Sequence, residues 1–157
     1  MADTAWGTCH RHHHKDSSIR FRAAKRLKSR DAILFDVLKW LRNYSDLERR
    51  TGSHVEYRLD TLAKELGGER PGRDRAVRAA VRTREVLGIG PKEPIRDLCG
   101  LLESAGIKVY TKAVASEGFF GLSVGPGDGG PAIVVNVWDR ISVERWIFTA
   151  AHELGHL

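Results

Sequence analysis

Two histidines and a glutamate near the end of the sequence have a spacing that suits a single metal ion. His152, Glu153 and His156 form the pattern H-E-x-x-H in a stretch with helical periodicity. Four residues of an α-helix correspond to about 400° of rotation and about 6 Å of rise, so both imidazoles can bind one tetrahedral cation. Zn²⁺ lowers the pKa of its bound water to roughly 7, and a neighbouring carboxylate can accept the proton. The pattern therefore predicts a Zn²⁺ site with His152 and His156 as metal ligands and Glu153 as the catalytic base.

We expect this motif to lie on a helix that covers residues 143–157. Ser142 or a neighbour is a suitable N-cap, and Glu144 suits the positive end of the helix dipole. Apolar flanking residues predict a buried helix, and a buried histidine needs a partner such as a metal. These residues are Trp146, Ile147, Phe148, Ala150 and Ala151. Gly155 is unfavourable in a helix and indicates close packing against another backbone. The alternative is a polar helix face with two incidental histidines.

The residues before this helix predict a small α+β unit. A linker at residues 88–91 precedes a helix that begins at Pro94 and ends at Gly106. Three apolar segments then read as short strands, the last of them the most buried. They cover residues 107–112, 120–124 and 131–137. We expect an α+β fold in which N-terminal helices precede a three-stranded antiparallel sheet and the motif helix.

The first 90 residues are expected to form a basic arm and a set of helices. Residues 1–30 lack sustained periodicity and predict a disordered arm. From Asp31, apolar residues recur at helical spacing up to Gly52. They are Leu34, Phe35, Val37, Leu38, Leu41, Tyr44 and Leu47. Two further helices are expected at residues 60–66 and 73–87. The predicted organisation is a disordered arm (1–30), a helical region (31–90) and a metal-binding domain (91–157).

The net charge of +6 is concentrated in that arm. Residues 11–30 hold eight Lys or Arg and a single Asp, while the remainder is about neutral. Such a segment can contact phosphates through charge alone, so weak nucleic-acid binding and a solvated tail are both open interpretations. Arg75, Arg78 and Arg82 recur on one side of a predicted helix, where a solvated face is the expectation.

Composition indicates a protein of the cytoplasm without membrane contact. No stretch of about 18 apolar residues occurs, and the N-terminus has no apolar run of signal-peptide length. Cys9 and Cys99 are too sparse for the disulfide framework of a small secreted domain. The histidines at positions 10 and 12–14 are interpreted as incidental.

Several segments of the sequence resemble the ImmA/IrrE family of metallopeptidases. They cover about residues 75–157 and include 94–98 (PIRDL), 102–109 (LESAGIKV), 132–136 (AIVVN) and 145–157 (RWIFTAAHELGHL). The resemblance implies a zincin-like domain, often joined to a helix-turn-helix, that cleaves a transcriptional repressor or antitoxin-like protein. On the matching positions it implies His152 and His156 as zinc ligands and Glu153 as the base. It also implies a substrate strand held at a sheet edge, either 120–124 or 132–137.

In that family the third metal ligand follows the motif helix, whereas this sequence ends at Leu157. A catalytic zinc site uses three protein ligands and a water, so two histidines alone should bind zinc weakly. We therefore expect residues 91–157 to be an incomplete ImmA/IrrE-type domain, in a fragment that is inactive in isolation.

Two other functions are compatible with the sequence. The basic, helical N-terminal half could serve a DNA-associated transcriptional regulator, although no segment of it reads as a convincing recognition helix. The chain could also be a non-functional relic of a peptidase. Salt-dependent binding to duplex DNA would favour the regulator, and zinc retention would favour the peptidase.

Overall fold

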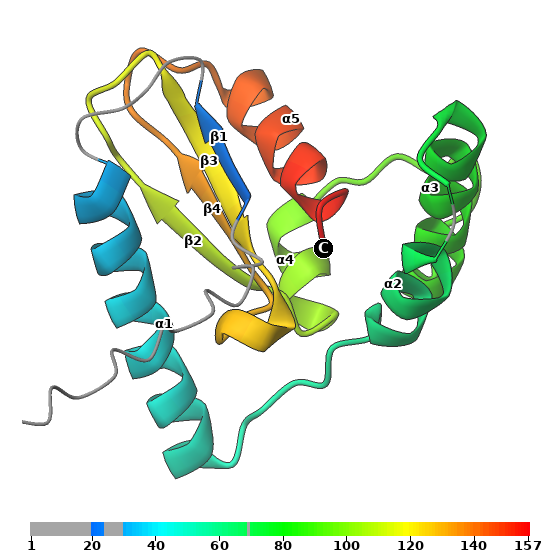
Figure 1. The fold of residues 1–157 in the computed structure, drawn as a ribbon, viewed down its shortest axis with the longest axis horizontal. Coiled ribbons are helices and arrows are strands. Elements are labelled where there is room, and N and C mark those ends of the chain that lie inside the picture. The colour runs from blue at the N-terminus through cyan, green and yellow to red at the C-terminus, as the bar shows by residue number, and fades with distance from the viewer. Residues whose placement is uncertain (1–19, 24–29, 69) are drawn as a thin grey trace, which may run out of the picture.

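The computed structural model describes residues 20–23, 30–68 and 70–157, and its α+β composition is the one expected (Figure 1). The helices are α1 (Arg30–Thr51), α2 (Asp60–Gly67), α3 (Arg73–Leu87), α4 (Leu98–Ser104) and α5 (Val143–Leu154). The strands are β1 (Arg20–Ala23), β2 (Lys108–Lys112), β3 (Phe119–Val124) and β4 (Ala132–Asn136). A single 3-10 turn, η1 (Pro126–Asp128), joins β3 to β4.

The strands form one mixed sheet in the order β1-β3-β4-β2. β2 and β4 are parallel, with Lys108 opposite Ala132, whereas β3 is antiparallel to both β4 and β1. The prediction of a three-stranded antiparallel sheet is therefore wrong about the direction of β2, and it omits β1. The cause is the order of the strands. Because β2 lies beside β4, the chain leaves β2, crosses the end of β4 and returns along β3.

β1 belongs to the arm that the sequence predicts to be disordered, and it departs from that prediction. Its backbone pairs with β3, from Arg20 opposite Ser123 to Ala23 opposite Phe119. A strand of four residues is too short for its periodicity to be recognised, and its partner is distant in the sequence. The rest of the arm, with the histidines at 10 and 12–14, lies outside the described residues.

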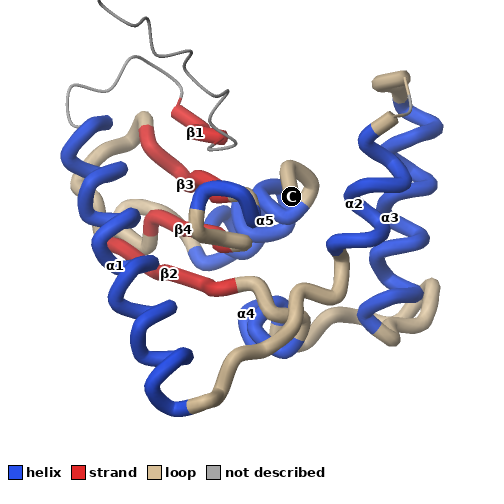
Figure 2. The backbone as a smooth tube through the Cα atoms, turned by 60° about the horizontal axis from the view of Figure 1, so that its bottom comes forward, coloured by secondary structure: helices blue, strands red, loops and turns tan. Residues whose placement is uncertain are grey.

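The sheet is covered by α1 on one face and by α4 and α5 on the other (Figure 2). All residues of β4 are buried, as expected for this strand, and they serve both faces. Val134 shares a core with Val37 of α1, whereas Ile133 and Val135 share a core with Ala150 of α5. The sheet is thus the middle layer of three.

α1 has the predicted extent, but only some of its apolar residues are buried. Ile33, Val37 and Leu41 recur every four residues and are buried against the sheet. Phe35 is 73% exposed and Leu47 is 60% exposed. The reason is geometric, because a straight helix can turn only one stripe toward a sheet.

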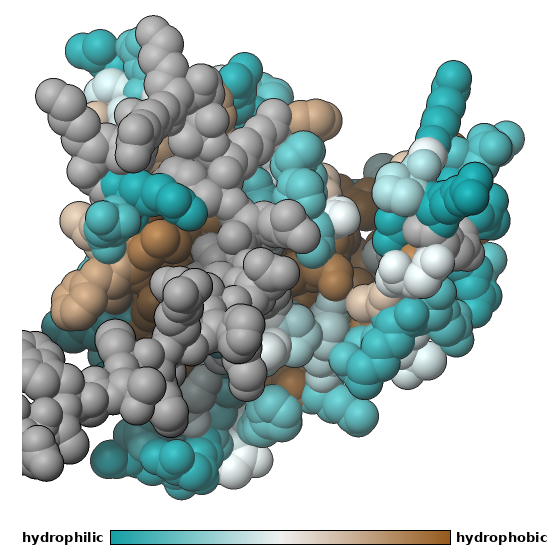
Figure 3. Space-filling view, in the orientation of Figure 1, coloured by the Kyte–Doolittle hydropathy of each residue, from teal (hydrophilic) through white to brown (hydrophobic). Residues whose placement is uncertain are grey.

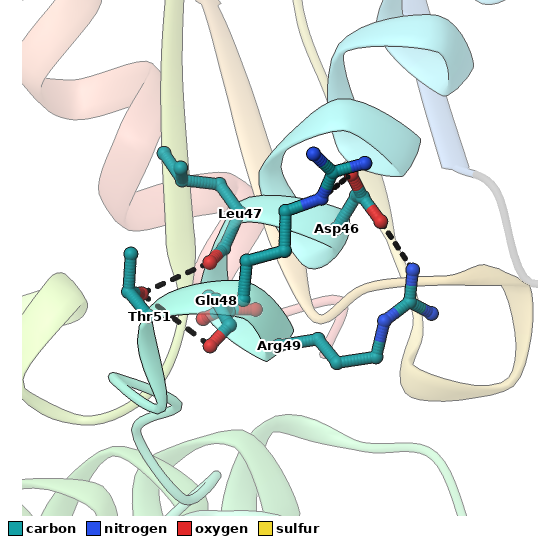
Figure 4. A network of polar contacts seen from close by, with 6 residues as sticks. Asp46, Leu47, Glu48, Arg49 and Thr51 are labelled. Atoms are coloured by element: carbon teal, nitrogen blue, oxygen red, sulfur yellow. Dashed lines mark hydrogen bonds and ion pairs between the residues drawn. The ribbon is translucent and has the colours of Figure 1, made fainter.

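Polar contacts hold the last turns of α1 (Figure 4). Asp46 pairs with Arg49, and the Thr51 hydroxyl donates to a backbone carbonyl of the preceding turn at 2.9 Å. Glu48, in the same turn, forms an ion pair with Lys108, whose Nζ lies 3.1 Å from the Glu48 Oε2, and this lysine is only 6% exposed. This largely buried ion pair connects α1 to the first residue of β2.

α2 and α3 form a helical hairpin (residues 60–87, the α2–α3 hairpin) that stands beside the sheet (Figures 1 and 2). Its base is anchored, because Leu59, Leu62 and Leu87 belong to the same core as Ile133 and Val135. Gly88 ends α3 in the left-handed conformation, with φ of 73°, as its position after the helix predicts. The helices between residues 30 and 87 therefore pack on different sides of the sheet.

α4 begins later than the sequence predicts. The sequence predicts a helix that starts at Pro94, yet Leu98 is the first residue of α4. Asp97 is the N-cap, and its Oδ1 accepts a hydrogen bond from the Gly100 N–H at 2.9 Å. Ile95 lies outside the helix and is 42% exposed.

A buried asparagine fixes the place where the chain crosses the end of β4. Asn136 Oδ1 accepts from the N–H groups of Val114 at 2.8 Å and Trp138 at 3.1 Å. Its Nδ2 donates to the carbonyls of Val114 and Phe119, each at 2.9 Å. Because Asn136 is fully buried, these bonds replace water for both the amide and the crossing backbone.

We predict that Asn136→Leu lowers the free energy of unfolding by about 3 kcal/mol or more, because several buried backbone groups lose their partner and each costs about 1–3 kcal/mol. Urea denaturation followed by circular dichroism measures the change. Asn43→Leu is the control, since Asn43 is exposed on α1, and it should change stability by less than about 0.5 kcal/mol. Equal effects of the two substitutions would show that the amide does not hold the crossing.

Candidate functional site

α5 positions the motif, and its N-terminal signals are confirmed. Ser142 is the N-cap, and its hydroxyl accepts from the Arg145 N–H at 3.4 Å. Hydrogen bonds from the Glu144 backbone, and then from Ser142, lower the pKa of the exposed Glu144 carboxyl. The helix ends at Leu154 rather than at residue 157. A tighter turn follows, in which the N–H of His156 bonds the carbonyl of Glu153 at 3.1 Å.

The two motif histidines meet at the end of α5. Their Nε2 atoms lie 3.2 Å apart, and their ring planes are nearly perpendicular, at 82°. Both side chains are exposed. The ring of Phe148 lies on the same side of the helix, with its centroid 6.4 Å from that of His152. The predicted convergence of both imidazoles on one point is therefore present.

The prediction that apolar flanks bury this helix is only partly right. Ala150 is fully buried and Trp146 is half-buried, but Ile147 is 40% exposed and Phe148 is 63% exposed. Ala151 is exposed as well. α5 covers one face of the sheet with a single stripe, and residues 100° or more away from that stripe face outward. The argument that the histidines need a metal because they are buried is therefore wrong.

Glu153 differs from the histidines in being fully buried. Its side chain lies over β3 beside Gly121, where an added Cβ would come within 3.5 Å of the Glu153 Cγ. The same Cβ would come within 2.7 Å of the Thr149 Cγ2 and of the Val134 carbonyl oxygen. Only a glycine at position 121 lets α5 approach β3 this closely. The sequence carries a signal for this contact, a lone glycine within a strand, which sequence analysis did not use.

Two further expectations are wrong. A Cβ at Gly155 would meet only the His152 carbonyl oxygen of its own turn, at 3.2 Å, so this glycine does not permit close packing against another element. Neither β3 nor β4 is a sheet edge among the described strands, because β1 pairs with β3 and β2 pairs with β4. A substrate strand could pair with β3 only in place of β1.

A cleft of about 440 Å³ opens beside the motif, between the end of α5 and the α2–α3 hairpin. Hydrophobic residues gather in this hollow (Figure 3). Leu154, Gly155, His156 and Leu157 form one wall, and residues of α2 and α3 form the other. The cleft therefore leads directly to one of the two histidines.

Comparison with protein-family models, with curated proteins and with solved structures finds no match to this chain. Among the described residues, no group of three or more His, Cys, Asp and Glu side chains is placed to hold a metal ion. None of the helices in this part of the chain is long and apolar enough to span a membrane.

We predict that Gly121→Ala destabilises the protein by about 1–3 kcal/mol, because the new methyl group overlaps Thr149 and the Val134 carbonyl. Urea denaturation measures the loss. Gly67→Ala is the matched control, since a Cβ there has no atom within 4 Å and alanine suits a helix better than glycine. This control should leave stability unchanged or raise it slightly. Unchanged stability of Gly121→Ala would contradict the close approach of α5 to β3.

Proposed function

We propose that this chain carries the metal-binding and catalytic part of a zinc-dependent endopeptidase. The observation that carries the proposal is the 3.2 Å separation of the His152 and His156 Nε2 atoms. Two nitrogen ligands of a tetrahedral Zn²⁺ ion, each at about 2.0–2.1 Å, lie about 3.3 Å apart. The separation of the two nitrogens therefore matches that of two corners of a zinc coordination sphere.

The chemistry of the donor set agrees with this fit. Both ligands are imidazoles, which suit zinc, and their exposed position lets a polypeptide reach them. When bound, Zn²⁺ supplies a Lewis acid and a water of lowered pKa. Glu153 follows His152 directly, and its carboxylate is the group in the motif that can accept a proton from a water held beside the imidazoles. Burial beside Gly121 limits the rotamers of Glu153.

The resemblance of residues 75–157 to the ImmA/IrrE family supports a regulatory role. On that basis we propose a transcriptional repressor or an antitoxin-like protein as the substrate. A catalytic zinc site needs a third protein ligand, which in that family follows the motif helix. Among the described residues no third His, Cys, Asp or Glu is grouped with these histidines, so the pair should bind zinc more weakly than a complete site.

The competing interpretation is a hydrogen-bonded histidine pair without a metal. At 3.2 Å, one Nε2 could donate to the other if the two rings adopt opposite tautomers. The two interpretations differ in a measurable way, because only the metal site makes zinc affinity depend on both histidines.

We predict that the chain binds one Zn²⁺ and that His152→Ala and His156→Ala each weaken this binding by about tenfold or more. Glu153→Gln should keep the affinity, since Glu153 is not a ligand. Competition with a chromophoric chelator near neutral pH measures the dissociation constant. The histidines at 10 and 12–14 are first replaced by glutamine, because they could bind zinc independently. His54→Ala serves as the control for loss of an exposed histidine elsewhere. Zinc affinity that is indifferent to His152 and His156 would sink the proposal.

A second prediction concerns the rate of hydrolysis and tests Glu153 as the general base. For any peptide-bond hydrolysis that the zinc-loaded protein shows, Glu153→Gln should lower the rate by about a hundredfold or more. The variant should retain its zinc, which separates loss of the base from loss of the metal. A variant that keeps both its metal and its rate would exclude Glu153 as the general base.

A further inference from the structure

The cleft between the end of α5 and the α2–α3 hairpin has the composition of a binding surface. Its volume is about 440 Å³, more than a single side chain fills, and apolar side chains line both walls. They include Leu62, Leu66, Ala76, Ala79, Leu154 and Leu157. An apolar cleft with a few polar groups is the usual form of a ligand site. His156 lies in the wall that belongs to α5.

The charge in this cleft comes from one arginine. Arg75 is half-buried in the wall formed by α3, and none of the described residues that line the cleft is Asp or Glu. Among the described residues Arg75 has no ion-pair or hydrogen-bond partner. Its neighbours on α3 differ, since Arg82 pairs with Glu85 at 2.6 Å and Arg84 Nε donates to the Gly90 carbonyl at 3.1 Å. The expectation of a uniformly solvated arginine face therefore does not hold at Arg75.

Tyr57 also lines the cleft, but its hydroxyl points into the protein interior rather than into the open space. The Tyr57 hydroxyl is buried and has no hydrogen-bond partner within the described part of the chain. Burial, and then the charge of Asp60, raise the pKa of Tyr57 to about 12, so the hydroxyl remains a donor at neutral pH. Because the hydroxyl is closed to solvent, Arg75 remains the charged side chain that a ligand in the cleft can reach directly.

We infer that this cleft binds an acidic polypeptide segment, with an Asp or Glu carboxylate on Arg75 and an adjacent apolar side chain among the leucines. A guanidinium is the side chain best suited to a carboxylate, because its planar N–H groups can bond both oxygens. A side-chain carboxylate, unlike a terminal one, lets the bound chain continue past Arg75 toward His156. The inference rests on the proposed function in one respect, which is that the bound segment would belong to the substrate of the peptidase.

The test uses fluorescein-labelled, C-terminally amidated peptides of eight residues, made of leucine and serine with one glutamate at each position in turn. Each has a counterpart with glutamine in place of glutamate. Fluorescence anisotropy measures their affinity for the full chain in chelator-treated buffer, so that no metal is required. We expect at least one glutamate peptide to bind about tenfold more tightly than its glutamine counterpart.

Substitutions at Arg75 should remove or reverse that preference. With Arg75→Gln the two peptides should bind alike, and with Arg75→Glu a lysine counterpart should become the tighter ligand. Arg82→Gln is the control, because it removes the same charge from α3 outside the cleft. Ala76→Phe narrows the cleft without changing its charge, and it should weaken every peptide. Circular dichroism checks that each variant is folded.

Three results would overturn the inference. The first is the absence of any glutamate preference, and the second is a preference that survives Arg75→Gln but disappears with Arg82→Gln. The third is tighter binding of a glutamine peptide with a free C-terminal carboxylate than of every amidated glutamate peptide, which would assign Arg75 to chain ends. Zinc affinity is measured separately, so failure of the metal site and failure of the cleft remain distinguishable.

Discussion

The contact of α5 with β3 at Gly121 determines the orientation of every group in the candidate site. Thr149 and Glu153 lie one turn apart on the buried side of α5, directly over a residue without a side chain. Once that stripe is fixed, the 100° rotation per residue sets the rest. His152 is turned about 100° from Glu153 and so leaves the buried side of α5. The tighter turn after Leu154 then brings the His156 Nε2 atom to 3.2 Å from that of His152. The exposure of the histidines and the burial of the glutamate thus have one cause.

The strand order explains why a buried asparagine is needed at the end of β4, where the chain passes from β2 to β3. β3 and β2 lie on opposite sides of β4, so residues 113–118 must cross the end of β4 to join them. A crossing backbone cannot continue the ladder of either strand, and its polar groups need other partners. Asn136 provides both a donor and acceptors at that point, whereas an apolar side chain would leave the carbonyls of Val114 and Phe119 unpaired. The position of β3 beneath α5 therefore depends on this crossing.

Most local signals were interpreted correctly, although the start of α4 was placed at Pro94 instead of after the N-cap Asp97. The helix bounds at Gly52 and Gly88, the N-cap Ser142 and the three strands from 108 to 136 all follow from residues next to one another. Sequence reasoning failed where a distant segment decides the outcome. Neither the parallel pairing of β2 with β4 nor the strand at residues 20–23 has a local signal. For the site, the spacing of His152 and His156 predicted their convergence, but the apolar flanks could not show which side of α5 the sheet would cover.

The cleft owes its shape to unequal anchoring of the α2–α3 hairpin. The base of the hairpin is held by the core that Leu59, Leu62 and Leu87 share with the sheet, and by the Arg58 side chain, which donates to the Val86 carbonyl. Beyond that base, the apolar residues of α2 and α3 face the end of α5 across a space instead of packing against it. Because the base is fixed, the space exists before any ligand enters, and its walls need no large rearrangement to bind one. The same anchoring places Arg75 and His156 in one cleft, although α4 and the strands β2, β3 and β4 lie between them in the sequence.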